Sequence, residues 1–410
     1  MEPLNTVAAL ITLTAIFGYL NYRYIRLPTT IGVMLIALVF SVLLVLAGKL
    51  GMTSVQETAI QVIKGIDFNF LLMQGLLSFL LFAGALHINM DDLAKQRLII
   101  LILATFGVLL STFLIGGMSW LVLHALGFDI ALIYCLLFGA LISPTDPIAV
   151  LGILKITHAP KTLSVKITGE SLFNDGIGVV VFLVLLGIAT GAEQPTPGSV
   201  ALLFVQEAVG GAVFGFVIGM LAYLMLKTID NYQVEVLITL ALVMGGYALA
   251  TAIHVSGPIA MVIAGLLIGN KGRNLAMSAI TRQHLDRFWE LIDEILNALL
   301  FTLIGLEVLV LTLKPEYLLA ILAILPLVLL ARFASVSIPV VILRRFREFT
   351  PNVIQIMTWG GLRGGISVAL ALSLPEGSSR EILLTLTYAV VVSSIAIQGL
   401  TIGKLIKGTI

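Results

Sequence analysis

Thirteen apolar stretches follow one another along this chain of 410 residues, and short polar loops connect them. An α-helix rises about 1.5 Å per residue, so about 20 apolar residues cross the roughly 30 Å hydrocarbon core of a bilayer. The pattern therefore predicts an all-α polytopic membrane protein with about 13 transmembrane helices and no soluble domain. The predicted spans are 6–20, 29–47, 69–87, 98–124, 130–153, 165–190, 200–227, 233–253, 257–270, 288–312, 316–343, 352–374 and 381–405.

The composition agrees with this class. Apolar residues make up 59% of the chain and charged residues 11%, whereas soluble domains are roughly 45–50% apolar and about 25% charged. Lysine and arginine number 23 against 22 acidic residues, so no basic surplus exists for binding nucleic acid. The single cysteine, Cys135, excludes an internal disulfide. We expect no cofactor.

Two of the thirteen spans are short. No basic flank precedes 6–20 and no small-residue cleavage site follows it, so we interpret it as a retained helix and not as a signal peptide. The stretch 257–270 is shorter still, and we expect it to be tilted, re-entrant or half-buried.

Basic residues distinguish the two sides of the predicted bundle. One alternate set of connecting loops holds 17 lysines and arginines, and the other set holds four. Cytoplasmic loops are enriched in these residues. The sequence therefore predicts that the N-terminus lies outside and the C-terminus inside. We expect the membrane to be a prokaryotic cell (inner) membrane.

Two predicted spans cannot be continuous helices. The fifth contains Ser-Pro-Thr-Asp-Pro at 143–147, and its two prolines remove backbone donors. The twelfth contains Gly-Gly-Leu-Arg-Gly-Gly at 360–365, and glycine weakens a helix interior. Spans seven apart run in opposite directions. We therefore expect an inverted repeat, with 6–190 and 233–405 linked by 200–227 in one transporter domain, 1–410, and two broken, crossing helices.

Five ionisable residues lie near the middle of a predicted span, where an unpaired charge costs several kcal/mol. Three carboxylates and two guanidinium groups leave one negative charge. One proton or one monovalent cation such as Na⁺ neutralises that charge, so competition between the two would produce exchange. The five residues are Asp146, Glu170, Asp175, Arg332 and Arg363.

The sixth span carries Gly-Glu-Ser-Leu-Phe-Asn-Asp-Gly at 169–176. Residues four apart share a helix face. Ser171 and Asp175 therefore form a stripe with hard-oxygen ligands for a small cation. Glu170 and Asn174 form a second stripe, a carboxylate beside an amide, suited to holding an arginine. The proton would bind Asp175 and Asp146 as a coupled pair, and the carbonyl freed at Thr145 is a further candidate cation ligand.

The motifs at 143–147, 169–176 and 360–365 occur in the order found in the NhaP-type sodium/proton antiporters of the monovalent cation/proton antiporter family, and the chain resembles that family over nearly all its length. The resemblance implies a homodimer that exchanges Na⁺ or Li⁺ for H⁺ by alternating access, with an elevator-like movement of a core part. An Asn in the Asn-Asp pair implies the electroneutral, one-for-one branch.

The resemblance also assigns residues. Asp175, Asp146, Ser171 and the Thr145 backbone oxygen would form the metal (Na⁺) site, and Asp175 would carry the competing proton. Glu170 would pair with Arg332. The site-support residues would be Asn174 and Arg363, the latter holding the second broken helix.

Two other classes remain open on the residues alone. One is a cation channel or uniporter, and the other is an intramembrane hydrolase with Asp146 and Asp175 as an aspartyl dyad. The antiporter is favoured because two opposed half-helices suit a closed central site and nearby arginines would keep both carboxylates ionised. We interpret Glu290, Asp293 and Glu294 as a solvated helix end and not as a cation entrance.

Overall fold

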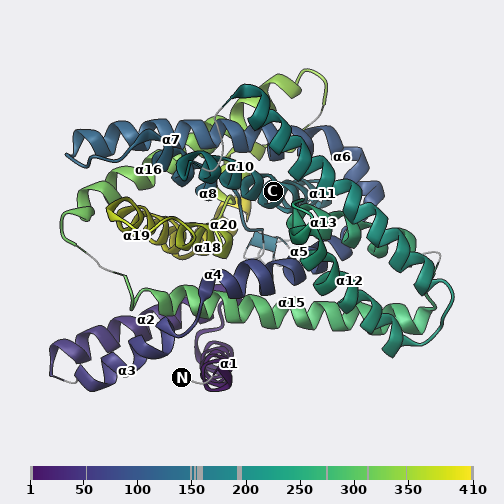
Figure 1. The fold of residues 1–410 in the computed structure, drawn as a ribbon, viewed down its shortest axis with the longest axis horizontal. Helices are drawn as coiled ribbons and strands as arrows, with labels where there is room; N and C mark the ends of the chain where they lie inside the picture. The colour runs from purple at the N-terminus through teal and green to yellow at the C-terminus, as the bar shows by residue number, and fades with distance from the viewer. Residues whose placement is uncertain are drawn as a thin grey trace.

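The computed structural model describes residues 3–51, 53–147, 150–151, 154, 160–191, 196–273, 276–311, 314–347 and 349–407. Within these ranges the chain is almost entirely helical (Figure 1). The first half contains α1 (Pro3–Leu20), α2 (Thr29–Lys49), α3 (Thr53–Lys64), α4 (Phe68–Phe70), α5 (Leu77–Leu86), α6 (Met90–Ile102), α7 (Val108–Ala125), α8 (Leu132–Ile142) and α10 (Lys161–Ala189).

The second half contains α11 (Pro197–Leu226), α12 (Tyr232–Ala252), α13 (Gly257–Leu267), α15 (Ala279–Glu307), α16 (Tyr317–Leu343), α17 (Val353–Trp359), α18 (Gly365–Leu372), α19 (Ser378–Ser393) and α20 (Leu400–Lys407). In the part of the chain that the structure describes, π-helical turns extend or join these helices: η1 (Asn21–Ile25), η2 (Leu71–Leu76), η3 (Leu103–Gly107), η4 (Ile268–Gly272) and η5 (Ser394–Gly399).

The prediction of an all-α polytopic membrane fold is confirmed. Every predicted span contains helix, and within the described ranges eight helical runs are long and apolar enough to cross a bilayer. The predicted short span 257–270 corresponds to the helical run Gly257–Gly272. Almost all residues of α13 within it are buried against α5, α11 and α12. Protein therefore covers this helix, which explains how so short a segment is accommodated. The amphipathic helix α3 was not predicted because polar residues interrupt its apolar face.

Loops of the lysine- and arginine-rich set contact one another, and so do two loops of the other set. The Asp92 carboxylate lies 2.6 Å from Lys161 Nζ, and other contacts join further loops of the lysine- and arginine-rich set. These contacts are Asn270 with Ile88, Thr281 with Asp230, and Lys166 with Phe349. In the other set, Lys314 pairs with Glu381.

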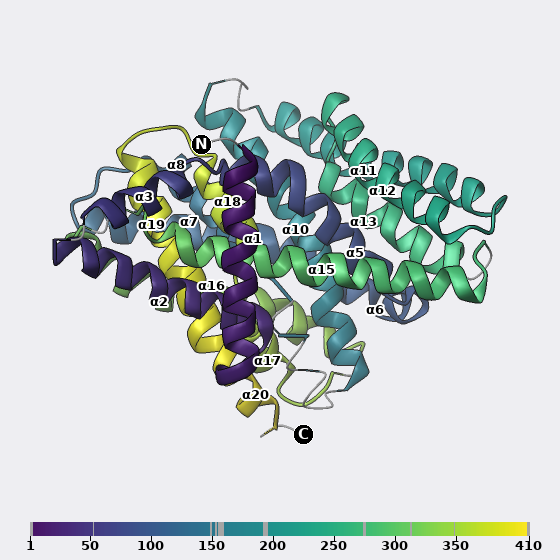
Figure 2. The same cartoon turned by 90° about the horizontal axis from the view of Figure 1, so that it is seen from below.

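The helices form two groups. In one group α6, α7, α8, α10, α16 and α19 pack against one another, together with the short helices around the two breaks. In the other, α2, α5, α11, α12, α13 and α15 pack together. Figure 1 shows the second group along the bottom and right, and Figure 2 shows α1 standing across α15 and α2. The groups meet along α10 and α18, which carry or flank the predicted site residues.

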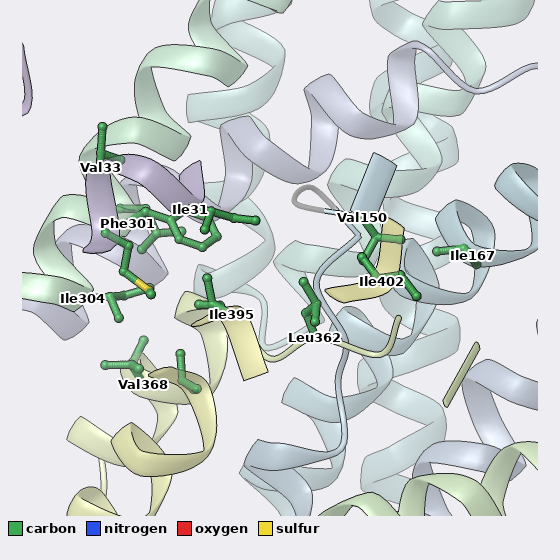
Figure 3. Close-up of a cluster of buried hydrophobic side chains, with 14 of the residues drawn as sticks. Ile31, Val33, Val150, Ile167, Phe301, Ile304, Leu362, Val368, Ile395 and Ile402 are labelled. Carbon is green, nitrogen blue, oxygen red and sulfur yellow. The ribbon is translucent and has the colours of Figure 1, made fainter. Parts of the chain in front are cut away.

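Apolar side chains fill the space where the groups meet near the second break. Ile31 from α2 and Phe301 from α15 are buried in one cluster with Leu362, which lies in the break itself (Figure 3). Arg363, the residue after Leu362, is buried next to this apolar cluster. Its polar groups therefore need hydrogen-bond partners within the protein.

Candidate functional site

The two broken spans meet through their backbones. Residues 143–147 lie between α8 and the next helical residues, and 360–364 separate α17 from α18. The Asp146 N–H donates to the Leu362 carbonyl at 2.8 Å, and these residues form an isolated antiparallel β-bridge. The bridge satisfies backbone groups that each helix loses at its break, which is required at membrane depth.

Glycine makes this close contact possible. A Cβ on Gly364 would lie 2.3 Å from the Asp146 carboxylate oxygen, and one on Gly361 would lie 2.7 Å from Arg332 Nε. Any side chain at either position would displace a charged group. The glycines of the second break therefore provide space for the site as well as ending the helix.

Thr145 is held against α10 by two side chains. Asn174 Nδ2 donates to Thr145 Oγ1 at 2.9 Å, and the Thr145 N–H donates to Asn174 Oδ1 at 3.3 Å. Thr145 Oγ1 also lies 3.0 Å from Ser171 Oγ. All three side chains are at most 2% exposed. The amide therefore fixes the first break.

This position of Asn174 differs from the expected one beside an arginine. Its hydrogen bonds go to Thr145, on the same side as Ser171. The physical reason is that residues three apart on a helix are also neighbours, so Ser171 and Asn174 reach one partner together.

Asp146 and Asp175 line one cavity of about 620 Å³, and Thr145 lines it too. Asp175 is 9% exposed and comes from α10, while Asp146 comes from the first break. Ser171, the fourth predicted ligand, does not line this cavity. It lies behind Thr145, to which it is hydrogen-bonded. The structure thus brings two carboxylates and one threonine to a common space.

The Glu170 and Arg332 side chains form a buried ion pair between α10 and α16. Arg332 Nη1 and Nη2 donate to the two carboxylate oxygens at 2.5 and 3.0 Å. Nη2 also donates to the Met357 carbonyl at 3.2 Å, in α17. Glu170 is 2% exposed and Arg332 is 6% exposed. One guanidinium group therefore joins three helices of the same group.

Arg363 connects the two breaks. Its Nη1 donates to the carbonyls of Gly361 at 3.1 Å and Pro144 at 3.4 Å. Its backbone N–H donates to Ser394 Oγ at 3.1 Å, in η5. The side chain is 2% exposed. Arg363 thus binds carbonyl oxygens that the interrupted helices leave free, on both broken spans.

The cavity continues from the two aspartates towards the face that holds the basic loops. The wall formed by α15 includes Glu290, Asp293 and Glu294, and His87 at the end of α5 also lines it. The sequence predicts a solvated helix end for these acids, whereas in the structure they line the cavity. Their three- and four-residue spacing was the available signal, because it puts them on one helix face. A sequence alone does not say what that face meets.

Comparison with known proteins places these features in context. A family model for the transmembrane sodium/hydrogen exchangers matches residues 10–408. The chain is 55% identical over 408 residues to the Na⁺/H⁺ antiporter NhaP of Pseudomonas aeruginosa. This match covers 98% of this chain and 96% of that protein. It is 35% identical over 375 residues to the Na⁺/H⁺ antiporter NhaH of Halobacillus dabanensis, covering 90% of this chain and 91% of the relative.

Among solved structures, the sodium proton antiporter MjNhaP1 from Methanocaldococcus jannaschii has a similar fold. The TM-score is 0.76 at 18% sequence identity, and the match covers 100% of this chain and 99% of that chain. The helical arrangement described above therefore also occurs in an experimentally solved structure.

The buried ion pair gives a stability prediction. Glu170→Ala or Arg332→Ala should each lower the free energy of unfolding by about 3–5 kcal/mol, because one charge is left buried without its partner. The double variant should lose less than the sum of the two single losses. Chemical unfolding of the detergent-solubilised protein measures these values.

The matched control for the ion-pair variants is Lys314→Ala, which breaks the exposed pair with Glu381. It should change stability little, since exposed ion pairs contribute little. Strictly additive losses in the Glu170 and Arg332 series would contradict the importance of their contact.

Proposed function

Because this chain belongs to the transmembrane sodium/hydrogen exchanger family, we propose that it is a Na⁺/H⁺ antiporter in which the cation and the proton compete for Asp175. It is a multi-pass membrane transporter and not an enzyme. Na⁺ or Li⁺ is the expected cation, with K⁺ as a further candidate.

The observation that carries the proposal is the shared cavity of Asp146, Asp175 and Thr145 at the two breaks. Carboxylate, hydroxyl and carbonyl oxygens are hard ligands that suit a small cation. Asp175 and Asp146 supply the charge, and the Thr145 backbone oxygen and Ser171 complete the proposed ligand set. Asn174 and Arg363 support this set by holding the first break and joining it to the second.

Charge supports a one-for-one stoichiometry. The Glu170–Arg332 pair is neutral, which leaves Arg363 against Asp146 and Asp175. The site then carries one net negative charge, which one proton or one Na⁺ neutralises. A divalent ion would leave it positive. The loaded site has the same charge with either substrate, so the exchange is proposed to be electroneutral.

The two helix groups support an elevator-like movement. Asp175 lies on α10, and Asp146 lies in the first break, next to α8 of the same helix group, whereas Glu290, Asp293 and Glu294 lie on α15 of the other group. The cavity lies between the groups. Sliding of the first group along the second would expose the same site to either side.

The proposal also includes the membrane topology of the chain and its assembly. The N-terminus is placed outside and the C-terminus inside, on the basis of the lysine and arginine distribution. The residues 6–190 and 233–405 are proposed as inverted repeats, with the two broken spans in matching positions. The protein is proposed to act as a homodimer in the lipid bilayer of a prokaryotic cell.

The central test is transport by purified protein in vesicles that contain a pH-sensitive dye. Na⁺ and Li⁺ should move protons, and Ca²⁺ should not. K⁺ is tested alongside them. Asp175→Asn should reduce the Na⁺-driven signal to that of empty vesicles, because the amide cannot exchange a proton. The control is Asp129→Asn, which neutralises an exposed loop aspartate. Full exchange by folded Asp175→Asn protein would refute Asp175 as the carrier.

Electroneutral exchange also predicts insensitivity to voltage. Initial rates of Na⁺-driven proton movement should be the same when a K⁺ diffusion potential of either sign is imposed with valinomycin. Because the imposed potential needs a K⁺ gradient, any proton movement that K⁺ itself drives must be absent or must be subtracted from these rates. A rate that rises with potential of one sign and falls with the other would exclude one-for-one exchange.

Movement between the groups can be blocked chemically. A Cβ on Gly84 of α5 would lie 3.9 Å from the Leu172 side chain of α10. In a Cys135→Ser background, cysteines at both positions joined by a short reducible cross-linker should stop exchange, and reductant should restore it. The single-cysteine variants under the same treatment are the controls. Continued exchange by fully cross-linked protein would exclude sliding along this contact.

A further inference from the structure

A separate cavity of about 480 Å³ lies where α1 ends and α2 begins. Arg23, Arg26, Tyr22 and Thr29 line it, as does the buried Asn21. None of these residues contributes to the ion site described above. The turn therefore needs its own explanation.

This turn is a defined structure. Asn21 is 3% exposed, and its side chain bonds both backbone groups of Leu27, with Nδ2 to the carbonyl at 2.9 Å and Oδ1 to the N–H at 3.3 Å. Arg26 adopts a left-handed conformation with φ 61°, and its N–H bonds the Asn21 carbonyl at 2.6 Å. The two arginines are thus held on a fixed backbone at the cavity edge.

The positive charge at this turn is not balanced within the described chain. Arg23 and Arg26 are exposed, and neither forms an ion pair with a described residue. No aspartate or glutamate occurs from residue 3 to residue 51. Two guanidinium groups therefore face the cavity without a protein counter-charge.

The start of α2 adds further donors. Its N-cap residue, Pro28, provides no side-chain acceptor, so the first N–H groups of this 21-residue helix have no capping partner from that residue. Thr29 is the first helical residue and lines the cavity. Free N–H groups and the helix dipole at this end favour an anion.

The side chains around the turn indicate its depth in the membrane. Tyr19, Tyr22 and Tyr24 are 62%, 84% and 70% exposed. Tyrosines collect where helices leave the hydrocarbon, at the level of the lipid head groups. Two apolar helices meet the turn here, since α1 ends and α2 begins at it. The cavity therefore opens at the depth where lipid phosphates lie.

We propose that this cavity binds the head group of an anionic phospholipid, with its phosphate between Arg23, Arg26 and the first turn of α2. A net negative head group matches the two unpaired arginines. A zwitterionic head group would add an ammonium charge for which the turn offers no carboxylate. Bound lipid would hold α1 against α2 at this end.

The test is lipid titration. The intact protein is placed in phosphatidylcholine nanodiscs with increasing phosphatidylglycerol, and bound lipid is counted by native mass spectrometry. Arg23→Gln with Arg26→Gln should weaken phosphatidylglycerol binding about 30-fold, because each arginine near an anionic surface contributes about 1 kcal/mol. Arg23→Gln alone, which leaves the left-handed residue intact, should weaken it about fivefold.

The matched control is Arg344→Gln with Arg345→Gln, which removes two exposed arginines elsewhere. This control should keep the wild-type affinity. An equal loss in the control, or unchanged binding in the Arg23 and Arg26 variants, would overturn the proposal. Inorganic phosphate should not raise the melting temperature as phosphatidylglycerol does, and an equal effect of phosphate would assign the cavity to a free ion and overturn the lipid assignment.

Discussion

One main-chain hydrogen bond, from Asp146 to the Leu362 carbonyl, joins the two interrupted spans at the centre of the bundle. The prolines of one break and the glycines of the other leave backbone groups that neither helix can satisfy. Pairing the two breaks satisfies part of this need and brings Asp146 and Arg363 into the same small region. The carboxylates, the threonine and the arginine of the candidate site are all positioned relative to this bridge.

The buried charges around the bridge have separate tasks. Arg332 is occupied by Glu170 and by a carbonyl of α17, so it fixes helices and takes no part in the cavity of the two aspartates. Arg363 contacts carbonyl oxygens at both breaks. Asp175 comes from an unbroken helix and faces the cavity. Glu170 and Asp175, five residues apart on α10, therefore have different surroundings: Glu170 is paired with Arg332, and Asp175 lines the cavity.

Much of this arrangement is predictable from sequence, because a bilayer imposes simple rules on length, polarity and loop charge. The spans, the two breaks and the five intramembrane charges follow from those rules. The contact of Asn174 with Thr145 does not, since a helical wheel cannot say which broken segment will lie alongside. The same limit applies to Glu290 and Asp293, because a helical wheel does not show that their face lines the cavity. Helix α3 was not predicted because polar residues interrupt its apolar face.

The supporting side chains Asn174 and Arg363 belong to the same set of packed helices and breaks as the two aspartates, and Arg332 joins three helices of that set. Under the proposed sliding movement, the ion ligands would move together with the bound ion, and their geometry would stay the same. Intrinsic affinity for the ion would then be equal at both membrane surfaces. Net flow would follow the difference between the sodium and proton gradients, and the same molecule would run in reverse whenever that difference changed sign.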